Sequence, residues 1–268
     1  AAVAVELVHN FSLLHDDVID GDLERRHRPT AWAAFGLGPA ILAGDALLSL
    51  ADEVLCEAPD ANVPASLAIL HGAIRRLIAG QAADVAFETR RDVQLDECLA
   101  MARDKTAALL ACSAALGAVL CGGPPAVVDG LARYGERLGL AFQLVDDLLG
   151  IWGEPAVTGK PVLSDLRARK KSVPVVRALT SGGPAGAQLA ELYASQGELS
   201  AGDLALAAAL IEETGARDWT EKQADRLLTE ALAELDQLAQ RAPRNRTDLP
   251  GVHADLVAIA HFMTGRDH

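Results

Sequence analysis

The sequence predicts an all-α fold, and three observations carry that prediction. Apolar residues recur at helical spacing through nearly the whole chain of 268 residues, which is the pattern of packed helices. Ala and Leu dominate over the β-branched and aromatic residues that favour strands, and only 4% of the residues are aromatic. The interruptions are short Gly and Pro stretches rather than linkers. Residues 1–268 are therefore expected to form a single helical domain with no convincing strand.

About ten helices follow from this pattern. The first runs from the start of the chain to about Ile19 and is followed by a loop, GDLERRHRPTAWAAFGLGP. The chain opens in helical pattern without an initiator Met or a capping residue, so an N-terminal segment is expected to be missing. The other helices are expected near residues 39–57, 63–89, 95–120, 125–151, 163–180, 184–196, 201–214, 217–241 and 250–264.

Local chemistry supports several of these boundaries. Pro124 and Pro125 follow two glycines, and Pro184 follows another two, so these rings belong in the first turn of a helix. Ser200 with Asp203 three residues later is the pattern of a capping box.

Composition excludes several classes of protein. The formal net charge of −13 argues against nucleic acid or an anionic membrane as the main partner, because both require a positive face. No apolar run reaches the roughly 18 residues of a membrane span. The four cysteines form no CxxC pair and are expected to be thiols in a reducing cytoplasm.

A first acidic cluster lies in the segment FSLLHDDVID. Asp16 and Asp20 are four residues apart, so a helix places both carboxylates on one face, with Asp17 beside them. Such close carboxylates repel one another unless a cation neutralises them, and Mg²⁺ is the hard cation that carboxylates share with substrate phosphates. The alternative is a solvated acidic helix end. That alternative is opposed by the helix dipole, which disfavours Asp at a C-terminus.

A second acidic cluster, Asp146 and Asp147, lies within the apolar segment FQLVDDLLGIWG. Carboxylates in such surroundings are costly unless they are paired or bind metal. Because the two clusters lie on separate helices, they could face each other across a bundle and hold a diphosphate through bridging metal.

Basic and polar residues that suit a diphosphate follow both clusters. A surface role is the usual reading of any single Lys or Arg, but their placement in an acidic chain favours a polyphosphate site. They are Arg25, Arg26, Lys105, Thr106, Lys160 and Lys170.

Together these segments resemble the trans-isoprenyl diphosphate synthases, the family that includes farnesyl and geranylgeranyl diphosphate synthases. ELVHNFSLLHDDVID, and RRHRPTAWAAFG followed by AILAGDALL, resemble its first aspartate-rich region. GQAADV, DKTAALL, FQLVDDLLGIWG and GKPVLSDLRARKKSVPV resemble its later signatures, in the family's order. The resemblance implies the all-α isoprenoid synthase fold, a helical bundle around a deep central cavity, usually as a homodimer. It also implies Mg²⁺-dependent condensation of an allylic diphosphate with isopentenyl diphosphate.

The resemblance also implies a role for each matching residue. Asp16, Asp20 and Asp146 would hold the metal, with Asp17 and Asp147 supporting them. The allylic diphosphate would be bound by Arg25, Lys105, Lys160 and Lys170, assisted by Thr106 and Gln143. His9 and Arg26 would belong to the isopentenyl diphosphate site, and Gln81 and Asp84 match an element that shapes the cavity. The implied catalytic set is Asp16, Asp17, Asp20, Lys105, Asp146 and Lys160.

Two positions before the first cluster bear on product length in this family. A bulky Phe11 followed by a small Ser12 resembles geranylgeranyl synthases more than farnesyl synthases, so geranylgeranyl diphosphate is the expected product. The alternative is that Phe11 only packs in the core and the cavity floor lies elsewhere.

The sequence departs from the family pattern in two ways. Gly150 stands where the second motif usually has its third Asp, and the upstream Gly-Lys-x-x-Arg element is absent. Because that third Asp is not usually a direct metal ligand, restoring it at Gly150 is expected to change the rate less than about tenfold. Two other functions stay open: a class I terpene cyclase, whose usual second metal motif is not found, and a non-catalytic partner subunit, which would not need the diphosphate-binding residues.

Overall fold

The computed structural model describes residues 1–58, 62–154, 162–241 and 249–265. Within these ranges the chain is almost entirely helical, which confirms the predicted fold class. The elements in chain order are α1 (Ala2–Asp20), β1 (Glu24–Arg25), β2 (Arg28–Pro29), α2 (Ala31–Phe35), α3 (Leu37–Cys56), α4 (Val63–Thr89), α5 (Leu95–Ala102), the π-helical turn η1 (Arg103–Ala107), α6 (Ala108–Leu120), α7 (Pro125–Trp152), α9 (Ser164–Arg167), α10 (Val173–Leu179), α11 (Gly183–Ala194), α12 (Ala201–Glu213), α13 (Ala216–Arg241) and α14 (Leu249–Thr264).

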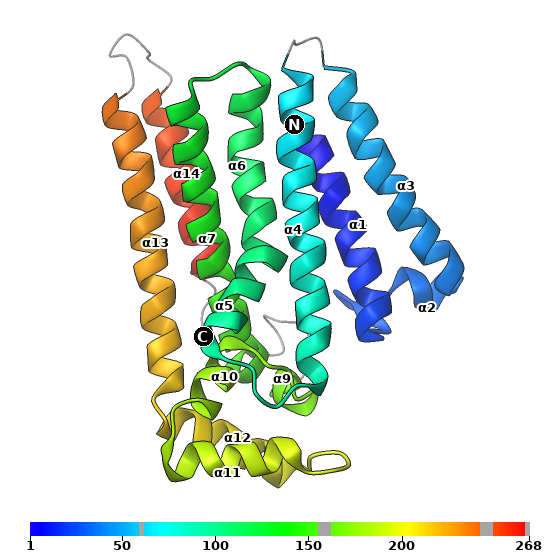
Figure 1. Ribbon diagram of the computed structural model, residues 1–268, viewed down its shortest axis with the longest axis vertical. Helices are drawn as coiled ribbons and strands as arrows, with labels where there is room; N and C mark the ends of the chain where they lie inside the picture. The colour runs from blue at the N-terminus through cyan, green and yellow to red at the C-terminus, as the bar shows by residue number, and fades with distance from the viewer. Residues whose placement is uncertain (59–61, 155–161, 242–248, 266–268) are drawn as a thin grey trace.

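The long helices form a row in which chain neighbours and distant segments lie side by side. Helix α13 packs on α7, α7 on α6, α6 on α4, and α1 on α3 (Figure 1). Helices α11 and α12 lie across one end of this row. In the described part of the chain, no helix is both long and apolar enough to cross a membrane.

Two apolar clusters position the acidic segments. One joins α1, α3, α4 and α6 and includes the buried side chains of Val8, Phe11, Leu55 and Leu70. The other joins α5, α7, α10 and α13 around residues such as Leu144. Because each cluster buries one face of α1 or α7, the acidic residues elsewhere on these helices are held at fixed orientations.

The predicted boundaries marked by local chemistry are confirmed. Pro125 and Pro184 lie in the first turns of α7 and α11, whereas Pro124 is the N-cap residue that precedes α7. Ser200 and Asp203 form a reciprocal capping box at the start of α12, satisfying two backbone N–H groups.

Three predictions of regular structure were wrong in detail. The expected loop after α1 contains the two-stranded hairpin β1–β2 and the short helix α2. The helix expected over 95–120 is interrupted by η1, and the one expected over 163–180 is two helices, α9 and α10. Propensity patterns do not resolve such breaks, because packing against neighbouring helices decides them.

Candidate active site

The first acidic cluster ends α1 and is bridged by an arginine from the hairpin. Arg25 Nε donates to Asp17 Oδ1 at 2.6 Å, and Arg25 Nη2 lies 3.6 Å from Asp16 Oδ2. The hairpin turns through Arg26 and His27, both at positive φ (52° and 61°), a conformation that residues with a side chain seldom adopt. The tight two-residue turn thus brings Arg25 back onto the carboxylates.

Lys105 links the first cluster to α4. Its Nζ lies 2.6 Å from Asp84 Oδ2 and 3.4 Å from Asp16 Oδ1. Burial opposes the charge on this ammonium, but Asp84 and Asp16 outweigh it, so the pKa of Lys105 is raised. Lys105 is therefore a fixed cation beside the first acidic cluster.

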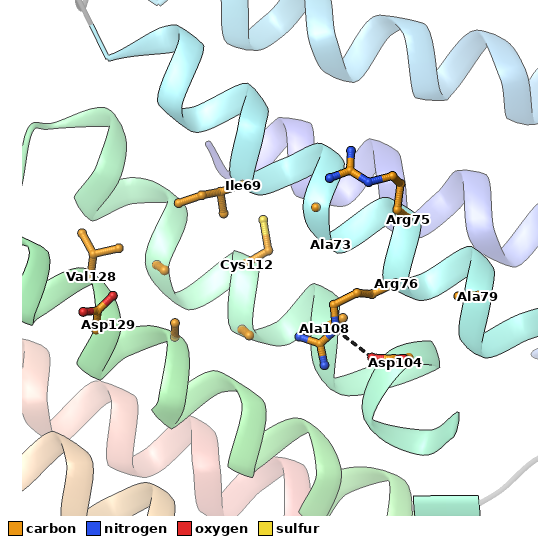
Figure 2. A pocket seen from close by; sticks show the side chains of 14 residues that line it. Ile69, Ala73, Arg75, Arg76, Ala79, Asp104, Ala108, Cys112, Val128 and Asp129 are labelled. Atoms are coloured by element: carbon orange, nitrogen blue, oxygen red, sulfur yellow. Dashed lines mark hydrogen bonds and ion pairs between the residues drawn. The ribbon is translucent and has the colours of Figure 1, made fainter. Parts of the chain in front are cut away.

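The π-helical turn η1 presents Lys105 and is held from two sides. Gly80 of α4 packs so closely that an added Cβ would meet the backbone N of Lys105 and lie 2.7 Å from its Cα. Arg76 Nε donates to Asp104 Oδ1 at 2.7 Å, and its Nη2 donates to Glu136 Oε1 at 3.0 Å. Figure 2 shows Arg76 reaching Asp104 in a groove of about 610 Å³ between α4, α6 and α7. Single π-turns of this kind are frequent at functional sites.

In the second cluster, the two neighbouring carboxylates have different surroundings. Asp146 is exposed, whereas Asp147 is buried. Gln143 Nε2 donates to Asp147 Oδ1 at 2.7 Å, and the Val173 backbone N–H donates to Oδ2 at 2.8 Å. Thr106 Oγ1 in turn donates to Gln143 Oε1 at 2.6 Å. Asp146 is thus free to meet a ligand, while Asp147 braces α7 against η1 and α10.

Burial has a large effect on Asp147. It raises the pKa of this carboxyl to about 7, against the opposing effects of Lys170 and of its two hydrogen-bond donors. The chain thus keeps a costly buried acid at this position.

Lys170 connects the two clusters electrostatically. Burial opposes its charge, but Asp165, Asp147, Asp84 and Asp146 outweigh that effect and raise the pKa of Lys170. The same ammonium acts on Asp20 of the first cluster. Both clusters therefore face one charged region that contains Lys105 and Lys170.

Asp20 shows how acidic this region is. Loss of hydration and repulsion from Asp16 raise the pKa of Asp20 to about 6, although Lys105 and Lys170 act in the opposite direction. Further positive charge would lower that pKa and keep Asp20 ionised.

The carboxylates of the two clusters could supply some, but not all, of the ligands that Mg²⁺ needs. Among the described residues, no three His, Cys, Asp or Glu side chains are close enough to form a complete metal site. However, Asp16 Oδ1 is buried and accepts no hydrogen bond from the described residues. Mg²⁺ is usually held by one or two carboxylates together with substrate phosphates and water, so these oxygens suit a metal that a diphosphate completes.

The remaining predicted residues have different positions. Arg26 lines a pocket of about 400 Å³ that also contains Asn10, Asp17, Arg25 and Arg28. His9 and Ser12 lie at helical spacing from Asp16 and so share its face of α1. Phe11 points instead into the core of α1, α3, α4 and α6. Lys160 lies outside the described residues.

Two candidate functional residues, Arg76 and Asp165, were not predicted from the sequence. Arg76 had no signal, because a lone Arg within a helix is ordinarily a surface residue. Asp165 lies inside the segment GKPVLSDLRARKKSVPV, but only the lysines of that segment were singled out. In the structure Asp165 is the carboxylate that acts most strongly on Lys170.

The chain matches a known protein family and several curated relatives. The Polyprenyl synthetase family matches residues 1–211. A (2E,6E)-farnesyl diphosphate synthase of Mycobacterium tuberculosis is 52% identical, over 99% of this chain and 72% of the relative. A geranylgeranyl diphosphate synthase of the same organism is 43% identical, over 99% of this chain and 73% of the relative.

Solved structures give the same result. A polyprenyl synthetase from Streptomyces coelicolor superposes with a TM-score of 0.89 at 48% identity, over 97% of this chain and 76% of that one. A geranylgeranyl pyrophosphate synthase from Corynebacterium glutamicum was solved with isoprenyl diphosphate and magnesium. It superposes with a TM-score of 0.86 at 32% identity, over 98% of this chain and 77% of that one.

The helical fold is therefore that of an isoprenoid synthase. The chain belongs to the polyprenyl synthetase family, and it is a trans-prenyltransferase of isoprenoid biosynthesis.

Proposed function

We propose that this enzyme condenses an allylic diphosphate with isopentenyl diphosphate, using Mg²⁺ held by Asp16, Asp20 and Asp146. The observation that carries the proposal is the shared charged region, in which Lys170 acts on both acidic clusters and Lys105 pairs with the first. Asp146 is exposed, and Asp16 Oδ1, although 3.4 Å from Lys105 Nζ, accepts no hydrogen bond from the described residues, so both carboxylates have oxygens that a metal could take.

The chain's own residues have distinct tasks in this reaction. Bound Mg²⁺ would supply positive charge to the departing pyrophosphate. Lys105, Lys170 and Arg25 hold the allylic diphosphate and stabilise the charge that develops on it. Departure of pyrophosphate leaves an allylic cation, which the double bond of isopentenyl diphosphate attacks, and loss of a proton completes the new prenyl chain. Apolar residues exclude the water that would quench the cation.

Lys160 is proposed to bind the allylic diphosphate together with Lys105 and Lys170, because of its place in the family motif. His9 and Arg26 are proposed for isopentenyl diphosphate, and Arg26 is supported by the arginine-rich pocket beside the first cluster. Thr106 and Gln143 are proposed to position Asp147 and, through α7, the exposed Asp146.

Assembly and location belong to the same proposal. Exposed Leu42 and Leu50 of α3, with Ile78 and Val85 of the neighbouring α4, support a homodimer. Four free cysteines support a cytoplasmic enzyme. We further propose that residues 1–268 act as one domain, because α7 contacts α6, α9, α10, α13 and α14.

Turnover assays with and without metal test the proposal. Asp16→Ala and Asp146→Ala should each lower kcat/KM at least about 100-fold, because each removes a ligand worth several kcal/mol of transition-state stabilisation. EDTA should abolish turnover and added Mg²⁺ should restore it. Asp129→Ala, at an exposed acid on the same helix as Asp146, is the matched control and should leave the rate unchanged.

Substrate omission separates the competing functions. Each allylic primer is assayed with and without isopentenyl diphosphate. Turnover that needs no isopentenyl diphosphate would indicate a terpene cyclase, and no turnover with any primer would indicate a non-catalytic subunit. Near wild-type rates in both Asp16→Ala and Asp146→Ala would defeat the proposed site.

A further inference from the structure

Gly150 occupies a position of α7 where a side chain would join the second acidic cluster. It lies four residues after Asp146 and three after Asp147, so its Cα is on the same face about one turn further along. A Cβ built there would lie 2.7 Å from Asp165 Oδ1 and still closer to the Cγ and Oδ2 of that residue. The space beside Gly150 is thus filled by the carboxylate of Asp165, which comes from α9.

Backbone and side-chain contacts hold Asp165 at this turn of α7. Ser164 Oγ donates to the Gly150 carbonyl at 3.3 Å, and the Lys170 backbone N–H donates to the Asp165 carbonyl at 2.9 Å. Leu166, the next residue, is fully buried. These contacts fix α9 against α7 and so place the Asp165 backbone beside Gly150.

The charge of Asp165 acts on the same groups as the second cluster. Among the carboxylates that favour the charged form of Lys170, Asp165 has the largest effect and Asp146 a smaller one. Asp165 also acts on Asp147 and opposes its ionisation. A carboxylate on another helix therefore has both the location and the electrostatic partners that a third acid of α7 would have.

We propose that Asp165 is a positioning residue that supplies the third carboxylate of the second acidic cluster, in place of the side chain that Gly150 lacks. Its carboxylate lies at the turn of α7 that follows Asp146 and favours the charged form of Lys170, so it would support the proposed binding of diphosphate and metal there. The inference rests on the proposed function of Asp146 and Lys170. It predicts a larger effect than the change of less than about tenfold expected from the sequence for an Asp restored at Gly150, because that side chain would meet the Asp165 carboxylate.

The rival explanation is that Asp165 only fits α9 against α7. Asp165→Asn separates the two, because Asn keeps the shape and removes the charge. Binding of pyrophosphate in the presence of Mg²⁺ is measured by calorimetry, alongside the unfolding midpoint of the ligand-free protein. We expect Asp165→Asn to weaken binding about 10- to 100-fold, the usual effect of losing a group that supports a metal site, with little change in the unfolding midpoint. Unchanged binding would overturn the proposal.

A second experiment moves the carboxylate from residue 165 to residue 150. Gly150→Asp alone and Asp165→Ala alone should each weaken Mg²⁺-dependent pyrophosphate binding. The double variant Gly150→Asp/Asp165→Ala should recover it to within about threefold of wild type, because coupled neighbours depart from additivity. If the double variant weakens pyrophosphate binding by the product of the two single-variant factors, the proposal is overturned. If Gly150→Asp does not fold, Asp165→Asn decides alone.

A parallel measurement separates this inference from the proposed function. Asp146→Ala should abolish Mg²⁺-dependent pyrophosphate binding. If Asp146→Ala binds normally, the proposed metal site fails together with the inference. If Asp146→Ala loses binding while Asp165→Asn and the single exchanges keep it, only the role of Asp165 is overturned.

Discussion

Alanine at Gly80 should disturb the active site through the backbone alone. The added Cβ would meet the backbone N of Lys105, lie 2.7 Å from its Cα and lie 2.8 Å from the carbonyl carbon of Asp104. All three contacts are with main chain, so no side-chain rotation relieves them, and η1 must move away from α4. Overpacking of this kind costs about 1–3 kcal/mol.

Gly72 provides the matched control on the same helix. A Cβ at Gly72 would meet nothing within 4 Å, so Gly72→Ala should stabilise the protein by about 0.5–1 kcal/mol through helix propensity. Gly80→Ala has the same gain in helix propensity. The difference in the free energy of unfolding between the two variants therefore gives the cost of overpacking alone, about 1–3 kcal/mol.

Kinetics and denaturation together test this reasoning. A shift of η1 moves Lys105 relative to Asp16 and Asp84, and a displacement of about 1 Å in a positioning group can cost on the order of 100-fold in rate. We therefore expect Gly80→Ala to lower kcat/KM at least about tenfold, while Gly72→Ala keeps the wild-type value. Equal stability and equal kcat/KM in the two variants would refute the close packing of α4 on η1.

Two further predictions concern other parts of the molecule. Hydrogen bonds from Arg133 and then from Arg137 lower the pKa of the buried Glu234, so its contribution to stability is present above pH 4.5 and is lost as pH falls. Glu234→Gln should therefore lower the free energy of unfolding by about 1–3 kcal/mol at pH 7, and a deficit in denaturant titrations that is equally large at acid pH would contradict this. For product length, geranylgeranyl diphosphate is expected, and Ser12→Phe should shorten it toward farnesyl whereas Phe11→Ala should lengthen it. Chromatography of dephosphorylated products checks this, and an unchanged distribution in both variants would remove the two residues from the cavity floor.

The sequence was sufficient to predict groups that depend on regular helical spacing. Asp16 and Asp20 share a face because four residues make about one turn, and the apolar residues around Asp146 and Asp147 identified a packed helix. The capping box at Ser200 depends on only four residues and was equally predictable.

Side-chain directions that depend on an interruption of regular helical spacing were not predictable. A π-helical turn holds one more residue per turn than an α-helix, so η1 changes the direction of every side chain after it by about 100°. Lys105 and Thr106 lie within this turn; the family resemblance identified the two residues, but regular helical spacing would not predict the directions of their side chains. Contacts distant in sequence fix this turn, among them the packing of Gly80 and the ion pairs of Arg76.

Local positive charge explains how an acidic chain can bind a diphosphate. The net charge of −13 would repel such a ligand from most of the surface, yet Arg25, Lys105 and Lys170 are each placed against carboxylates. Nearby carboxylates raise the pKa of Lys105 and of Lys170, and ion pairs order Arg25 and Lys105 before any ligand arrives. Burial and then repulsion from Asp16 raise the pKa of the neighbouring Asp20 to about 6. A diphosphate arriving with a divalent cation satisfies both sets of charges, whereas either one alone leaves one set unpaired. Binding of the two ligands should therefore be mutually dependent, since each removes the repulsion that opposes the other.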